Sequence, residues 1–391
     1  MKIMGELLTC CKSLVRVLPL KKIQRKIYLK PWLNSIEYIR GVSMAGVVAI
    51  HTGSQYLLNP TPNIHLVALF EVVSRFSVPI FFFISAFGLF YRMNFDEPFS
   101  YGKFLRRRLK AVLIPYLLWS TFYLLHDNHF YGYQLFPDFD YAAEIYFFGL
   151  AKYHLYFLVI LIWFYLLMPL WIFLVKRMTP TKLFLLLAAQ VAFDYWSSYS
   201  GWLWQFVNSL PPDSLLQMCL KWRLNWLVLH YVFVFVLGGV LGIYSEKFFA
   251  WCKAHKKIIS ATFLIALITL LGYYYFLIYV RNFSATAAVN TAHQLSPPGI
   301  FYTIAASIFL FTLFQFGKLP APLKNFLSVM GKNSYFVYLA HPLAIHYLAL
   351  GLGKLGLIMT APNALIFYVA TIAVTLSVKL LSQKSFQAFR R

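Results

Sequence analysis

Long apolar runs recur along this chain and constrain its fold more than any other feature. Each run has about 20 residues, the length that an α-helix needs to cross the hydrocarbon core of a bilayer. A spanning segment must satisfy its own backbone N–H and C=O groups, so the runs predict helices. We therefore expect an all-α, polytopic transmembrane helical bundle of about ten spans, near residues 35–53, 66–91, 104–125, 154–175, 181–198, 224–244, 257–280, 298–317, 333–352 and 362–381.

The composition excludes an ordinary soluble protein. Hydrophobic residues make up 60% of the 391 residues and charged residues only 12%, too few to cover a soluble surface. The formal net charge of +23 is typical of nucleic-acid binding, but the basic residues fall in short connections between apolar runs. That distribution favours anionic lipid headgroups as the partner of the charge, and we expect no nucleic acid to bind.

The same charges predict the orientation of the spans. If the N-terminus is cytoplasmic, the even-numbered connections are cytoplasmic and should be basic. The second connection carries Arg92, Lys103, Arg106, Arg107, Arg108 and Lys110, whereas the third carries Asp127, Asp138, Asp140 and Glu144 against Lys152. We expect both termini in the cytoplasm, with a basic interfacial segment at 1–33, a transmembrane domain at 34–382 and a basic tail at 383–391.

The first span holds two ionisable residues separated by an uncharged run. Arg40 and His51 are eleven residues apart, which returns a helix to within about 20° of its starting direction after a rise of about 16 Å. Glu37 lies one turn before Arg40 and is placed to pair with it. This stripe indicates either a polar path with a titratable base at its outer end, or an arginine that snorkels to the headgroups and a histidine that bonds to a loop.

The second span contains a further ionisable pair. Glu71 and Arg75 are four residues apart on one face, where an ion pair makes both tolerable in lipid. The pair either holds the helix against a neighbour or contacts substrate, and the sequence favours neither. Pro79 removes the N–H that would bond to the Arg75 carbonyl and predicts a kink there.

Two other spans carry polar stripes. Arg106, Arg107 and Arg108 open the third span and fan out over about 200° of helix. At least one should face inward, where it either sets topology or meets the phosphates of a donor. In the ninth span, Tyr335, Tyr338 and His341 recur every three residues beside Pro342, so they line a polar cavity or bond to other helices.

Two irregular segments interrupt the pattern of spans. Residues 141–150 are too short to cross the bilayer and too apolar for a free loop, so they re-enter or lie at the outer interface. Residues 195–213 are rich in Trp and Tyr, which indicates an outer aromatic belt or a carbohydrate platform. The four cysteines have no metal-ligand spacing, and we expect no metal and no permanently bound cofactor.

Five segments in order resemble the acyltransferase-3 family of integral membrane acyltransferases. They are Arg40 with His51, SVPIFFFISAFGLF (77–90), KFLRRRLKAVLIPYLLWS (103–120), YHLYFLVILIWFYLLMPL (153–170) and NSYFVYLAHPL (333–343). The resemblance covers about residues 34 to 381. One departure is Ala86, where the family usually has glycine after Ser85.

The resemblance implies an O-acetyltransferase that moves an acyl group, usually acetyl, from acetyl-CoA as co-substrate to a hydroxyl of a cell-envelope glycan or lipid-linked sugar. It implies His51 as general base, Arg40 as a structural or donor-orienting residue and Arg106–Arg108 as a donor-binding segment. Glu37, Glu71, Arg75, Ser85, Tyr338 and His341 are then cavity or supporting residues. A multi-pass protein of a bacterial plasma membrane is the implied setting.

A transporter or flippase for lipid-linked sugars is the alternative function. In it, Glu71, Arg75 and His51 are proton-coupling or substrate groups. Transporters often contain two related halves with matched broken helices, and the sequence has no repeat of the Arg40–His51 helix. A non-catalytic membrane scaffold does not account for the polar stripe.

Overall fold

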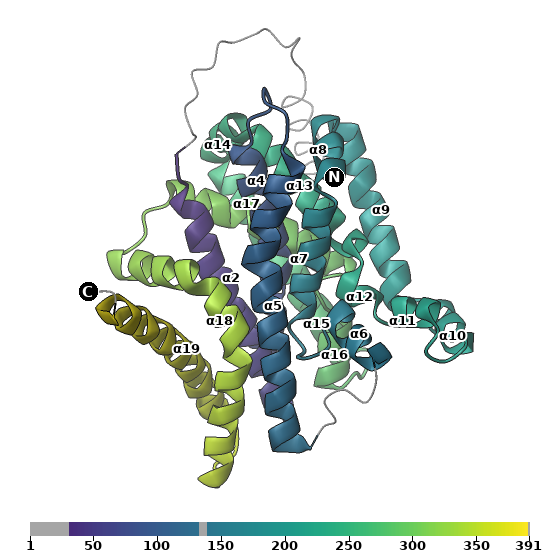
Figure 1. Cartoon of the computed structure of the whole chain (residues 1–391), viewed down its shortest axis with the longest axis vertical. Coiled ribbons are helices and arrows are strands. Elements are labelled where there is room, and N and C mark those ends of the chain that lie inside the picture. Colours follow the sequence, from purple (N-terminus) through teal and green to yellow (C-terminus); the bar gives the residue numbers. More distant parts are fainter. Residues whose placement is uncertain (1–30, 133–138, 390–391) are drawn as a thin grey trace. The chain divides into compact units, whose positions relative to one another are not determined.

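The computed structural model describes residues 31–132 and 139–389, and these fold into helices without strands (Figure 1). The all-α prediction is therefore confirmed for the described part of the chain. Almost all of the predicted N-terminal segment, residues 1–30, lies outside it.

Each of the ten predicted apolar segments lies mainly in helix. Six helices are long and apolar enough to cross a membrane, and eight if two sharply bent pairs each count as one span. The ten-span count and the cytoplasmic termini stay predictions. The six are Ile64–Arg92, α5 (Tyr101–Tyr131), α15 (Lys256–Tyr279), α17 (Pro297–Phe316), α18 (Ala321–Lys354) and α19 (Ala361–Phe389); the pairs are α7 (Tyr156–Leu166) with α8 (Met168–Lys176), and Val228–Ile243 with α14 (Ser245–Ala254).

The described residues form two compact units. The first contains residues 92–132 and 139–240, and the second contains residues 31–91 and 241–389. The range that we expected as one transmembrane domain, 34–382, contains both.

The helix α2 (Asn34–Tyr56) is the centre of the second unit (Figure 1). It contacts α17, α18, α19 and residues 68–76 of the following helix, so its neighbours are mainly protein. A helix surrounded by other helices does not need lipid-compatible side chains, which explains why α2 tolerates Glu37, Arg40 and His51. The predicted first span is thus an internal helix of the bundle.

Glycines bring α2 and α18 into backbone contact. A Cβ atom at Gly41 would lie 2.5 Å from the carbonyl oxygen of Leu327, and one at Gly331 would overlap the carbonyl oxygen of Glu37. Small residues at such crossings allow close packing inside membranes. This contact also explains why α18 begins at Ala321, twelve residues before the predicted span: the segment from 327 to 331 packs on α2.

Gly331→Ala should destabilise the protein, because the added methyl group collides with the backbone of α2. We expect the free energy of unfolding to fall by about 1–3 kcal/mol, the usual cost of overpacking. The matched control is Gly353→Ala in the same helix, since no atom lies within 4 Å of a Cβ there. Unfolding of both variants in mixed detergent micelles is the measurement, and equal losses would contradict the backbone contact.

The helix that follows α2 is irregular around its ionisable pair. It runs through α3 (Ile64–Val67), a π-helical turn η1 (Ala68–Val72), a 3₁₀ turn η2 (Val73–Phe76) and α4 (Ser77–Arg92). The 3₁₀ turn contains Arg75, whose carbonyl lacks the N–H of Pro79, whereas the π-helical turn lies too far before Pro79 for the same explanation; the predicted kink stays a prediction. Such turns often occur at functional sites, and here they carry Glu71 and Arg75. The short α16 (Ala285–Thr291) completes the second unit.

In the first unit, α5 packs against α7, and α7 also contacts α6 (Phe139–Phe148) and α12 (Arg223–Trp226). The hydroxyl of Tyr116 donates to the carbonyl of Tyr146, 2.6 Å away, which fixes α6 on α5. The predicted re-entrant or interfacial segment 141–150 is thus mainly the helix α6. The remaining elements are α9 (Pro180–Tyr199), α10 (Gly201–Ser209), α11 (Leu215–Lys221), η3 (Val228–Tyr231) and most of α13 (Val232–Ile243).

The aromatic segment 195–213 forms the end of α9 and the whole of α10. Leu203 and Val207 are buried, whereas Trp202 and Trp204 on the same helix are exposed. Trp202 stacks on Phe206 with a centroid distance of 5.5 Å. An exposed aromatic face fits both an interfacial belt and a carbohydrate platform, so both predictions stand.

Candidate functional site

Two histidines from α2 and α18 stack on each other in the second unit. The ring centroids of His51 and His341 lie 5.1 Å apart, and the ring planes make an angle of 24°. His341 is fully buried, whereas His51 is partly exposed. His51 is therefore the less buried member of the pair, and His341 packs against it. Two polar stripes that the sequence places far apart meet at this pair.

Pro342 sets the orientation of the His341 ring. Proline has no N–H, so the Tyr338 carbonyl, four residues earlier, loses its helical partner. Nδ1 of His341 replaces it, 2.8 Å from the Tyr338 oxygen and 3.1 Å from the Val337 oxygen. Both neighbours are acceptors, so Nδ1 carries the hydrogen and the neutral ring keeps its lone pair on Nε2.

The ionisable residues at the start of α2 contact α18. Glu37 accepts a hydrogen bond from Ser328 and forms an ion pair with Lys332, with 3.7 Å between Nζ and Oε1. Glu37 therefore ties the beginning of α2 to α18. Arg40 lies one turn later and is half-buried. Its pairing with Glu37 stays a prediction.

Glu71 connects α2 with the distorted helix. Its Oε2 lies 2.9 Å from Nη2 of Arg75, and its Oε1 accepts a 2.8 Å hydrogen bond from Ser54. Nη2 of Arg75 also donates to the Val289 carbonyl at 3.4 Å. The predicted pair of Glu71 and Arg75 is confirmed. Ser54, which the sequence analysis did not single out, joins the pair to α2.

This network lies beside the stacked histidines. Ser54 follows His51 by three residues, so both side chains lie on one face of α2. Gly53 makes the approach possible, because a Cβ there would lie 2.8 Å from Cγ of Glu71. His51 itself stacks on His341. The site thus combines two imidazoles and a guanidinium held by a carboxylate.

Two further candidates lie near this site in the chain. Tyr338 is buried one turn before His341, and its ring centroid lies 6.2 Å from that of His341. Ser85 is half-buried on α4, beside the fully buried Ala86. The structure connects Tyr338 to the histidine pair, and the role of Ser85 stays a prediction.

The predicted donor-binding arginines lie on α5, in the first unit. Arg106 and Arg107 are exposed. Arg108 is half-buried, with its guanidinium 5.7 Å from the ring centroid of Phe104 and 5.6 Å from that of Tyr165. Arg108 is therefore the inward-facing member of the three. The role of all three toward a donor stays a prediction.

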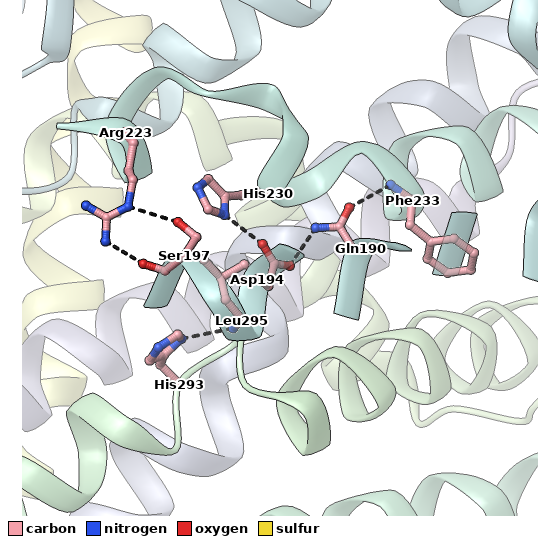
Figure 2. Close-up of polar contacts among 8 residues, drawn as sticks. All are labelled: Gln190, Asp194, Ser197, Arg223, His230, Phe233, His293 and Leu295. Atoms are coloured by element: carbon pink, nitrogen blue, oxygen red, sulfur yellow. Dashed lines mark hydrogen bonds and ion pairs between the residues drawn. The ribbon is translucent and has the colours of Figure 1, made fainter. Parts of the chain in front are cut away.

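A polar seam that the sequence analysis missed crosses the first unit (Figure 2). Asp194 on α9 lies 2.6 Å from Nδ1 of His230 and accepts a 2.5 Å hydrogen bond from Gln190. Gln190 in turn accepts from the N–H of Phe233, near the start of α13. The side chains of Asp194 and His230 have no exposed surface. The sequence does contain a pattern that indicates such a buried polar contact: Gln190, Asp194 and Ser197 recur at helical spacing in an otherwise apolar run.

Arg223 lies at the end of the same seam, and its hydrogen bonds explain how the protein accommodates its buried charge. It donates to the hydroxyl and carbonyl of Ser197 and to the carbonyl of Leu220, and it lies 4.7 Å from the ring centroid of Trp204. These carbonyls belong to the last turns of α9 and α11. Helix C-termini carry partial negative charge, which balances the buried guanidinium.

The chain was also compared with known proteins. A family model described as "Acyltransferase domain" matches residues 33–380, nearly the whole chain. Neither the curated proteins nor the solved structures offer a match. The matched region includes both polar stripes that meet at His51 and His341.

Proposed function

Because the chain belongs to the acyltransferase-3 family, and is thus a membrane acyltransferase, we propose that it moves an acetyl group from acetyl-CoA to a hydroxyl of a cell-surface polysaccharide or lipid-linked sugar. The observation that carries the proposal is the stacked pair of His51 and His341, with His51 partly exposed. The protein then works as a multi-pass enzyme of a bacterial plasma membrane.

His51 acts as the general base in this reaction. Its neutral imidazole takes the proton of the acceptor hydroxyl as the hydroxyl oxygen attacks the carbonyl carbon of the thioester. The new C–O bond forms, the C–S bond breaks, and CoA leaves with the proton that His51 returns to sulfur. The products are the ester and free CoA thiol, and His51 is neutral again.

The other candidate residues orient the reactants. His341 packs against His51 and limits the directions its ring can take. Arg106, Arg107 and Arg108 bind the phosphates of CoA, for which guanidinium groups are well suited. Arg40, half-buried on the same stripe as His51, orients the donor along α2.

A labelling experiment tests this function. Membrane vesicles from cells that produce the protein, and matched vesicles without it, receive acetyl-CoA labelled in the acetyl carbon. We expect free thiol to appear only with the protein, and label to enter the carbohydrate or lipid-linked sugar fraction as a base-labile ester. Absence of both signals, with movement of a lipid-linked sugar across the same vesicles, would contradict the proposal and favour a flippase.

A further inference from the structure

Arg75 is held in place by only part of its guanidinium group. An arginine offers five N–H donors. The hydrogen bonds and the ion pair of Arg75 within the described residues all use Nη2, which contacts Glu71 and the Val289 carbonyl. Nε is buried without a hydrogen-bond partner. Nε and Nη1 therefore donate no hydrogen bond to the described residues.

The position of the guanidinium group is fixed by its neighbours. Glu71 binds Nη2 of Arg75 from one side and is itself fixed by Ser54 of α2. The Arg75 side chain is 13% exposed, so it is neither sealed in the bundle nor free in solvent. A buried N–H group without a partner is destabilising. Its position beside the histidine pair favours a hydrogen-bond acceptor supplied by the substrate.

Acyl transfer creates such an acceptor. When the hydroxyl oxygen attacks the thioester, the π electrons of the carbonyl move to its oxygen and form an oxyanion. Fixed donors aimed at that oxygen supply the largest share of stabilisation in many acyl-transfer enzymes. His51 takes the hydroxyl proton, and His341 packs against His51, so neither histidine is assigned to the oxyanion. Arg75 is the cation beside His51 with unused donors.

We propose that Arg75 is a catalytic residue that donates a hydrogen bond from Nε to the carbonyl oxygen of the acyl thioester. This inference rests on the proposed acyl transfer and assigns a second role in the same site. Glu71 is then a positioning residue, because it acts only through Arg75. The oxyanion collapses by re-forming the C=O bond as the C–S bond breaks, so Arg75 gains and loses no proton.

Two CoA analogues test the assignment without knowledge of the acceptor. One is a trifluoromethyl ketone analogue of acetyl-CoA, whose hydrate places an oxygen where the oxyanion forms. The other is S-ethyl-CoA, which has no carbonyl oxygen. We expect the parent to bind the ketone at least about tenfold more tightly, as enzymes bind mimics of their transition states. Arg75→Lys and Arg75→Gln should lose most of this preference and keep the affinity for S-ethyl-CoA within about twofold.

The control variants separate catalysis from folding. Arg281→Gln removes an exposed arginine at the end of α15 and should keep the full preference. Glu71→Gln leaves Arg75 in place without its carboxylate and should reduce the preference partly. Ketone preference retained in both Arg75 variants would overturn the assignment, and so would a parent that binds the two analogues equally. A parent that binds neither analogue would contradict the proposal that CoA is the donor. It would also contradict the proposed role of Arg75, which depends on that donor.

Discussion

Replacing His51 with glutamine should lower the rate of acyl transfer by about 10²–10⁴-fold, the usual contribution of a general base. Glutamine keeps a polar group of similar reach but cannot take a proton from the acceptor hydroxyl. His341, the other member of the stacked pair, is fully buried and is not placed to take over this role. The measurement is the initial rate of thiol release from acetyl-CoA in vesicles.

His65→Gln is the matched control for this loss. His65 is an exposed histidine of the same unit, bonded to the hydroxyl of Tyr275 at 2.8 Å, and has no place in the proposed chemistry. Its variant should keep the parent rate. A His51→Gln variant that is folded and keeps more than about a third of the parent rate would contradict the assignment of His51 as general base.

Replacing Asp194 with alanine should cause the largest loss of stability among the polar residues discussed here. The substitution removes the shared partner of His230 and Gln190, both of which are buried. A buried polar group left without its partner costs about 1–3 kcal/mol, so two groups cost about 2–6 kcal/mol. The measurement is the free energy of unfolding in mixed detergent micelles.

Asp140→Ala serves as its control in the same unit. Asp140 is an exposed carboxylate at the start of α6, and its removal should change the free energy of unfolding by no more than about 0.5 kcal/mol. A loss below about 1 kcal/mol for Asp194→Ala would mean that the seam does not hold α9 to residues 228–233. Asp194→Asn should fall between the two, because the amide keeps one acceptor oxygen.

Helical periodicity made the interactions within single helices predictable. Glu71 and Arg75 are four residues apart and pair as expected. The stripe that places Tyr338 one turn before His341 is also observed. These features depend on one helix each, so the sequence carries the information.

Contacts between helices were less accessible from the sequence. Nothing along the chain indicates that Glu37 contacts Ser328 and Lys332, about 290 residues away, because the crossing of α2 and α18 depends on Gly41 and Gly331. The same holds for His51 and His341, whose positions in the sequence do not indicate that their rings stack. Asp194 was missed for another reason: its helix was interpreted only as an apolar span, although Gln190 and Ser197 share its face.

Whether His51 and His341 act as one unit is the central claim, and a double-mutant cycle tests it most directly. The rates of acyl transfer are measured for the parent, His51→Gln, His341→Gln and the double variant. Residues that act as a unit show losses that do not add. We predict that the double variant is within about threefold of His51→Gln alone. A double variant whose loss equals the product of the two single losses would contradict the account.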